Sequence, residues 1–211
     1  VKTLPKARER GQRTAWPNRP HLLVCHDFQG GYTESLHAQG YTFEHWQGTD
    51  IMVYFSHKRV SLPPPGWVRA AHFHGTQILG TLLFEWDESK LDLRCLLDGW
   101  EPTWRTKVRA ELSTYFADEL IRLAAAHGID GFLVNVETSL ALTAHSNPIL
   151  HRLDSFHNAA RLRRWIRYLR DKGQERLSTW HVVWYDSVTY PDGQLPVSYT
   201  HLRAHETKAN L

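Results

Sequence analysis

The sequence predicts an α/β fold in which strands and helices alternate along the chain. Short apolar runs, often β-branched, recur along the chain with little polar interruption. This pattern is typical of strands buried on both faces of a parallel sheet. The runs cover residues 22–25, 51–55, 78–84, 132–136 and 182–185. Between them, apolar side chains recur three and four positions apart, as on the buried face of a helix, over residues 105–127 and 158–172. Gly128 and Gly173 follow these stretches, and we expect them to cap two helices. The alternation indicates βα units and a parallel sheet.

Five strands fit either part of a barrel or a complete doubly wound sheet. A (β/α)8 TIM barrel has eight units and about 250 residues, so five units would leave it open. A doubly wound sheet that binds nucleotides has a G-x-G-x-x-G turn after its first strand, whereas only Gly30-Gly31 follows here. We therefore expect a (β/α)8 TIM barrel truncated to about five βα units over residues 21–195, after an irregular lead-in over residues 1–20.

Composition narrows the functional classes. The 211 residues are 42% apolar with a net charge of +3, and the basic cluster at residues 161–170 is interpreted as solvated helix surface, so no nucleic-acid partner is expected. Cys25 and Cys95 are too few for a disulfide framework, which predicts a reducing compartment, and they lack metal-type spacing, so no metal site is expected. No apolar run or signal peptide indicates a membrane segment. Because the chain begins at Val1 and its single methionine is Met52, we expect an upstream segment.

Polar side chains lie at the ends of the predicted strands. In a parallel barrel the carboxyl ends of the strands form the active-site face, so these side chains are expected to gather there. For His26, His57 and Asp186, it is an equally good interpretation that the side chain caps a helix or is a hydrogen-bonded polar group of the core. The candidates are His26-Asp27, Ser56-His57, Glu85, Asn135 with Glu137, and Tyr185-Asp186.

Asn135 and Glu137 are the strongest candidates for chemistry. They are two positions apart, so on a strand both side chains point to the same side. Burying them in an apolar run is costly unless they are hydrogen-bonded or functional. Most glycosidases pair two carboxylates, whereas here the partner is an amide, which could orient the acetamido group of a substrate sugar as an internal nucleophile. Glu137 would then be the acid and base, with a raised pKa expected for the acid step, and nine Trp residues suit sugar stacking.

Six ordered segments resemble the catalytic barrel of endo-β-N-acetylglucosaminidases of glycoside hydrolase family 85, in their cytosolic animal-type form. The resemblance implies cleavage between the two N-acetylglucosamine residues of the chitobiose core, without a cofactor, through an oxazoline intermediate. It also implies N-linked glycans, glycopeptides or free oligosaccharides as partners and a cytosolic location. The segments are HLLVCHDFQGGY (residues 21–32), HWQGTDIMVYFSH (45–57), PPGWVRAAHFHG (64–75), ILGTLLFEW (78–86), DGFLVNVE (130–137) and WYDSV (184–188).

The resemblance assigns roles by matching position. It implies that Asn135 assists the acetamido group, that Glu137 is the acid/base, and that Tyr185 lies near the oxazoline. Further residues in the matching motifs are expected to bind the sugar: His26, Asp27, Tyr54, His57, Glu85, Trp86 and Trp184.

The chain departs from the family pattern in two places. Thr138 stands where the family usually has Asn, which alters a polar contact beside the acid/base. After Leu195 the family runs into Trp-Gln-Asn, whereas residues 196–211 resemble nothing in it. We interpret this tail as a sequence artefact or an alternative ending, and we expect the last three barrel strands to be missing. The sequence predicts neither the preferred glycan type nor the oligomeric state.

Two other functions remain open at this stage. Chitinases of family 18 have the pattern Asp-Gly-x-Asp-x-Asp-x-Glu, which would require aspartates where Leu133 and Asn135 stand. A non-catalytic glycan-binding remnant would keep tryptophans for stacking without turnover. Release of glycan from a glycopeptide separates an enzyme from a binding module.

Overall fold

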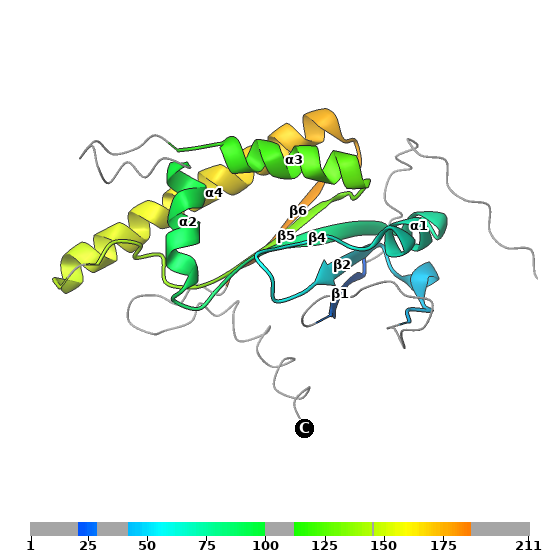
Figure 1. Ribbon diagram of the computed structural model, residues 1–211, viewed down its shortest axis with the longest axis horizontal. Coiled ribbons are helices and arrows are strands. Elements are labelled where there is room, and N and C mark those ends of the chain that lie inside the picture. The colour runs from blue at the N-terminus through cyan, green and yellow to red at the C-terminus, as the bar shows by residue number, and fades with distance from the viewer. Residues whose placement is uncertain (1–20, 29–41, 100–111, 145, 187–211) are drawn as a thin grey trace, which may run out of the picture.

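The sheet is built from parallel strands in the order in which they occur along the chain. The computed structural model describes residues 21–28, 42–99, 112–144 and 146–186. In them the order is β1-β2-β4-β5-β6, all neighbours parallel, as Figure 1 shows. The predicted α/β fold with a parallel sheet is confirmed. These strands are β1 (Leu23–Asp27), β2 (Ile51–Phe55), β4 (Gln77–Glu85), β5 (Gly131–Glu137) and β6 (His181–Asp186).

A short strand extends the sheet beside β4. The first residues of β4, 77–79, pair with β2, and β3 (Val60–Ser61) then pairs antiparallel with Leu82 and Thr81 of β4. A doubly wound sheet reverses its strand order at a switch point and carries helices on both faces. The described strands run without such a reversal.

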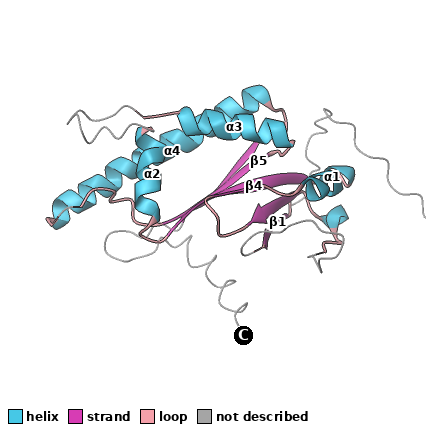
Figure 2. Cartoon of the chain, in the orientation of Figure 1, coloured by secondary structure: helices cyan, strands magenta, loops and turns pink. Residues whose placement is uncertain are grey.

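The described α-helices cover one face of this sheet. They are α1 (Pro65–Phe73), α2 (Ser89–Asp98), α3 (Tyr115–His127) and α4 (Pro148–Arg176), and a 3-10 turn, η1, covers Trp46–Gly48. Figure 2 shows α2, α3 and α4 on one side of the strand layer. Alternate strand residues and the apolar sides of the helices form the main core there, which includes Met52, Ile78, Phe84, Phe132, Val134, Trp67, Leu97, Ile121 and Trp165.

The other residues of each strand point to the opposite face. Val53, Leu79 and Leu133 form a second, smaller apolar cluster, and none of its members comes from a helix. Successive side chains of a strand alternate between faces, so Asn135 and Glu137 continue the row that Leu133 begins. The candidate chemistry therefore lies on the face away from the described helices.

The first predicted helix begins later than expected. The apolar pattern predicts a helix over residues 105–127, but α3 begins at Tyr115 and residues 112–114 are not helical, while residues 105–111 lie outside the described part. The N–H of Ser113 donates to the carbonyl of Leu97 at 2.9 Å, which ties this segment to the end of α2. Gly128 ends α3 with a φ of 74° and an N–H bond to Ala124, so the predicted cap is confirmed.

The second predicted helix is longer than expected. The pattern predicts residues 158–172, whereas α4 spans Pro148–Arg176. Its start is set by Asn147, whose side chain accepts from the N–H of Ile149 at 2.8 Å, and by Pro148 in the first turn. Gly173 is not a cap: it lies inside α4 against Trp180, where a Cβ would come within 2.2 Å of the indole. Glycine is needed there because only it lets the ring reach the helix backbone.

Asp130 joins three elements at the edge where the strands begin. Its side chain is almost fully buried, and one carboxylate oxygen accepts from the N–H of Ile78 at 2.9 Å and lies 2.7 Å from Nε2 of His72 in α1. The other oxygen accepts from the hydroxyl of Thr179, before β6, at 2.6 Å. In a parallel α/β fold this edge is the one that serves stability.

We predict that Asp130→Ala lowers the free energy of unfolding by about 3 kcal/mol or more, because it leaves several buried donors without an acceptor. Urea unfolding followed by circular dichroism measures the change. The matched control is Asp171→Ala, an aspartate that is 54% exposed on α4. A loss no larger than that of the control would show that the Asp130 contacts do not support the fold.

Candidate active site

The register of β4, β5 and β6 brings polar side chains together at the carboxyl edge of the sheet. Glu85 is the strand partner of Glu137, and Asn135 lies between Leu83 on one side and Tyr185 on the other. Partnered residues on parallel strands point to the same face, and Tyr185 packs beside the Leu133 cluster. Glu85, Asn135, Glu137 and Tyr185 therefore share the face away from the helices.

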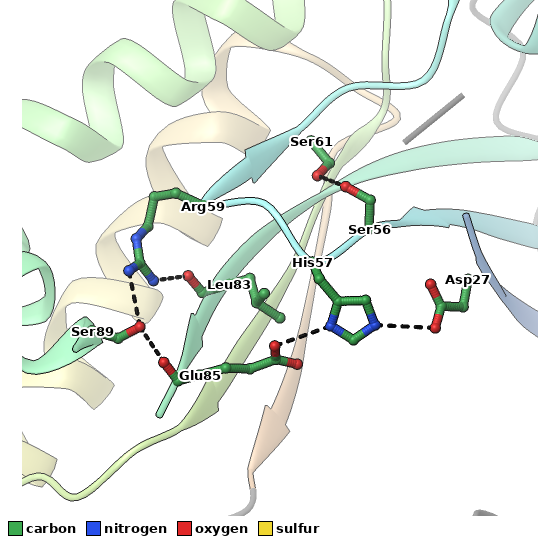
Figure 3. Close-up of polar contacts among 8 residues, drawn as sticks. All are labelled: Asp27, Ser56, His57, Arg59, Ser61, Leu83, Glu85 and Ser89. Atoms are coloured by element: carbon green, nitrogen blue, oxygen red, sulfur yellow. Dashed lines mark hydrogen bonds and ion pairs between the residues drawn. The ribbon is translucent and has the colours of Figure 1, made fainter. Parts of the chain in front are cut away.

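His57, which follows β2, bridges two carboxylates. Its Nδ1 lies 3.0 Å from Oε2 of Glu85, and its Nε2 lies 3.2 Å from Oδ2 of Asp27, as Figure 3 shows. Only the imidazolium form can donate from both ring nitrogens. The hydrogen bond to Glu85 raises the pKa of His57; partial burial opposes this, and the bond to Asp27 adds to it. Of the two carboxylates, Glu85 is the more enclosed, at 14% exposure against 50% for Asp27.

Arg59 fixes the backbone at the end of β4, and sequence reasoning did not find it. Its guanidinium donates to the carbonyl of Leu83 and, at 2.9 Å, to the hydroxyl of Ser89, which in turn donates to the carbonyl of Glu85 (Figure 3). Its Nε donates to Asp92 at 3.0 Å. These contacts hold the backbone of Glu85 in place independently of its side chain. The available signal was the position of Arg59, two residues after His57 in the same strand-following segment.

Trp86 presents its side chain at the same edge. It follows Glu85 directly, is 75% exposed, and has a φ of 62°, the one positive φ of a non-glycine residue in the described ranges. A left-handed backbone at such a residue costs about 1–3 kcal/mol, and strain of this kind clusters at functional sites. The backbone therefore holds a large indole in water beside a candidate carboxylate.

Asn135 has an unused hydrogen-bond acceptor. The residue is 3% exposed, and its Oδ1 has no hydrogen-bond partner within the part of the chain that the structure describes. A buried amide oxygen in this state is unfavourable, so such groups require an explanation. The hydroxyl oxygen of Thr138, the residue at which the sequence departs from the family pattern, is also buried without a partner. Asn135 can thus accept a hydrogen bond from a donor that enters the site.

The structure does not bring three of the sequence candidates to this face. His26 stacks on Phe28 at 4.3 Å, and burial lowers its pKa, with Asp27 acting in the opposite direction. Tyr54 is 3% exposed and stacks on the ring of Phe28 at 4.4 Å. Trp184 is the strand partner of Val134 and packs against the main core. All three lie on the helix-covered side, and their part in sugar binding stays a prediction.

Other features of the described residues limit the chemistry. The hydroxyls of Ser56 and Ser61 lie 2.5 Å apart and are buried, so they join β2 to β3 (Figure 3). In the described ranges no group of three His, Cys, Asp or Glu side chains is arranged to hold a metal ion. Nor does any helix of those ranges combine the length and apolar character needed to cross a membrane.

Comparison with known proteins shows which family the chain is similar to. The profile of glycosyl hydrolase family 85 matches residues 26–201, ending inside the segment 196–211 that was expected to lie outside the family. The chain is 37% identical over 183 residues to the cytosolic endo-beta-N-acetylglucosaminidase of Mus musculus, covering 84% of this chain and 22% of that protein. It is 36% identical over 179 residues to cytosolic endo-beta-N-acetylglucosaminidase 2 of Arabidopsis thaliana, covering 82% and 22%.

The human cytosolic endo-beta-N-acetylglucosaminidase is 36% identical over 183 residues, covering 84% of this chain and 21% of that protein. The chain thus spans about a fifth of the length of these curated relatives. No solved structure matches it.

Proposed function

This chain belongs to glycosyl hydrolase family 85, and from that premise we propose that it is part of an enzyme that cleaves the β-1,4 bond between the two N-acetylglucosamine residues of the N-glycan core. It is homologous to endo-beta-N-acetylglucosaminidases of plants and mammals. The proposed substrates are N-linked glycans, glycopeptides or free oligosaccharides.

The unpaired oxygen of Asn135 is the observation that carries the proposal. The oxygen is buried on the same face as Glu137, and it lacks a donor. An acetamido N–H is such a donor. Binding it there would turn the acetamido carbonyl oxygen toward the anomeric carbon of the same sugar. Asn135 is a strand neighbour of Tyr185, so the ring that forms would lie beside the phenol.

The proposed reaction then needs one carboxyl group acting twice. Glu137 gives its proton to the leaving glycosidic oxygen as the bond between this oxygen and the anomeric carbon breaks. In the same step the acetamido oxygen forms a bond to the anomeric carbon. The resulting oxazolinium is opened by water, whose proton returns to Glu137, so the configuration is retained. Glu137 is exposed at the end of β5, within reach of both a leaving group and water.

Family membership and topology support a barrel as the complete fold. Sequential parallel strands with helices on one face are the arrangement of part of a (β/α)8 barrel, in which the opposite face becomes the interior. On this proposal the Val53, Leu79 and Leu133 cluster belongs to the barrel interior. Trp86 then offers an indole face for stacking on sugar at the barrel mouth.

We also propose a cytosolic location. The curated relatives are named cytosolic, and both cysteines of this chain, Cys25 and Cys95, are free thiols.

The first test removes the acid/base group. We predict that Glu137→Gln lowers the rate of glycan release from a glycopeptide by about a thousandfold, because an amide cannot donate the proton or take it back. Released glycan is measured by mass spectrometry, for this chain and for any longer protein that contains it. The control is Glu175→Gln on the exposed surface of α4.

Unchanged release by Glu137→Gln would remove this residue from the chemistry. If the wild-type protein binds the glycopeptide and releases nothing, the chain is a glycan-binding module instead of an enzyme.

The second test separates substrate assistance from a carboxylate nucleophile. We predict that Asn135→Ala loses hydrolysis of the natural glycan but keeps part of its activity on a preformed sugar oxazoline, because that donor no longer needs its acetamido group oriented. Product formation from each substrate is followed by chromatography. Equal losses with both substrates would argue against the acetamido group as nucleophile.

A further inference from the structure

His57 connects two strands that are not neighbours in the sheet. β1 and β4 lie on either side of β2, and His57 follows β2 at the carboxyl edge. Its Nδ1 lies 3.0 Å from Oε2 of Glu85 on β4, and its Nε2 lies 3.2 Å from Oδ2 of Asp27 on β1 (Figure 3). The ring therefore makes a side-chain link across β2 that the backbone ladder does not supply.

The protonation state of the His57 ring decides how many of these bonds it can make. An imidazolium donates from both ring nitrogens, whereas a neutral imidazole donates from one nitrogen and only accepts at the other. A carboxylate is itself only an acceptor, so it cannot bond to a ring nitrogen that has lost its proton. Between two carboxylates, loss of one proton from His57 therefore breaks one of the two hydrogen bonds.

The surroundings of the two carboxylates decide which bond the neutral ring keeps. The side chain of Glu85 is 14% exposed and that of Asp27 is 50% exposed. A hydrogen bond is electrostatically stronger where water is excluded, and a donor lost from an enclosed carboxylate is costly to replace. Water can readily replace the bond to the half-exposed Asp27. The bond to Glu85 is also the shorter of the two, so the neutral ring should carry its proton on Nδ1.

We propose that His57 is a positioning residue with two states: as an imidazolium it ties Asp27 to Glu85 across β2, and as a neutral ring protonated on Nδ1 it keeps Glu85 and releases Asp27. The two states are a property of the fold. Their effect on glycan cleavage rests on the proposed function, because Asp27 is among the residues expected to bind the sugar.

The tied state is the acidic one. The hydrogen bond to Glu85 raises the pKa of His57 above its ordinary value of 6.5; partial burial opposes this shift, and the bond to Asp27 adds to it. The link is therefore fully present below the ordinary value and is lost as the pH rises through the raised pKa. In the described residues, the charged groups that act on the ring are Asp27 from β1 and Glu85 from β4, and the ring of Phe55 meets it edge to face at 5.4 Å.

The end of β4 does not depend on His57 for its position. Arg59 donates to the carbonyl of Leu83 and to the hydroxyl of Ser89, which in turn donates to the carbonyl of Glu85. These bonds involve neither His57 nor the Glu85 side chain. Substitution of the ring or of either carboxylate therefore leaves the backbone of this strand end held.

The test is a pH series of long-range 1H–15N NMR spectra of the histidine rings, which distinguish the imidazolium from each neutral tautomer. The signals of His57 are assigned through the backbone resonances and confirmed by their absence in His57→Gln. In the wild type, we expect His57 to titrate above pH 6.5 and to carry its proton on Nδ1 at high pH.

Two variants and a control test the choice between the carboxylates. Glu85→Gln should lower the titration midpoint of His57 more than Asp27→Asn does, because the bond to Glu85 is the main cause of the raised pKa. It should also move the proton of the neutral ring to Nε2, since Asp27 is then the only carboxylate bonded to it. Asp27→Asn should leave that proton on Nδ1. Asp171→Asn, an aspartate of similar exposure on α4, should change neither property.

A proton on Nε2 of the neutral ring in the wild type overturns the proposal, and so does a His57 midpoint at or below pH 6.5. Neither outcome depends on whether a variant folds. A proton that stays on Nδ1 in Glu85→Gln also overturns it, because a merely structural ring would not change tautomer with its partners. The glycopeptide assay separates the two proposals: the expected tautomers without glycan release refute the enzyme alone, and release with the opposite tautomer refutes the two states of His57 alone.

Discussion

The pairing of β4 with β5 is the constraint on which the site depends. Residues Gly80 to Glu85 align with Phe132 to Glu137 in a parallel ladder. Because side chains alternate, a slip of one residue would turn Asn135 and Glu137 under the helices and expose the core residues beside them. The amino-terminal end of the ladder is locked: the N–H of Asp130 donates to the carbonyl of Ile78 at 2.9 Å, while the Asp130 carboxylate accepts from the N–H of Ile78. A Cβ at Gly80 would come within 2.5 Å of the carbonyl of Ser61, so only glycine permits the close packing of β3, β4 and β5.

The two edges and the two faces of the sheet differ in the side chains that they carry and in their structural roles. The edge where strands begin holds the buried Asp130 contacts, and the edge where they end holds Asp27, His57, Glu85 and Glu137. The face under the helices is apolar and closely packed. The opposite face changes along β5 from the buried Leu133 cluster to the buried amide of Asn135 and then to the exposed carboxylate of Glu137. Asn135 and Glu137 thus lie outside the main core, where a substrate can supply the hydrogen bond that the Asn135 oxygen lacks.

Local patterns predicted the strands well because strands buried on both faces have continuous apolar runs. The two-residue spacing also placed Asn135 and Glu137 on one side, as the register shows.

The same alternation of side chains would have separated His26 from Asp27 and Trp184 from Tyr185, since adjacent residues on a strand point to opposite faces. The bridge through His57 joins residues 28 and 30 positions apart, and the Arg59 contacts span up to 33, so both need the strand order and register. The first ten residues of α4 were not predicted as helix because their apolar side chains are exposed and do not form a buried face. The Asn147-Pro148 pair at the start of the helix was the sequence signal that could have predicted where it begins.

Cross-linking of β4 to β5 tests the central claim, the register, most directly. In a background with Cys25→Ser and Cys95→Ser, the account predicts that Glu85→Cys with Glu137→Cys forms an intramolecular disulfide on mild oxidation, because partnered Cα atoms about 4.8 Å apart lie within disulfide range. Leu83→Cys with Glu137→Cys should remain reduced, since a two-residue offset separates the Cα atoms by about 8 Å. Mass spectrometry of the peptides reads out both pairs. A disulfide in the second pair and none in the first would contradict the register and, with it, the arrangement of the site.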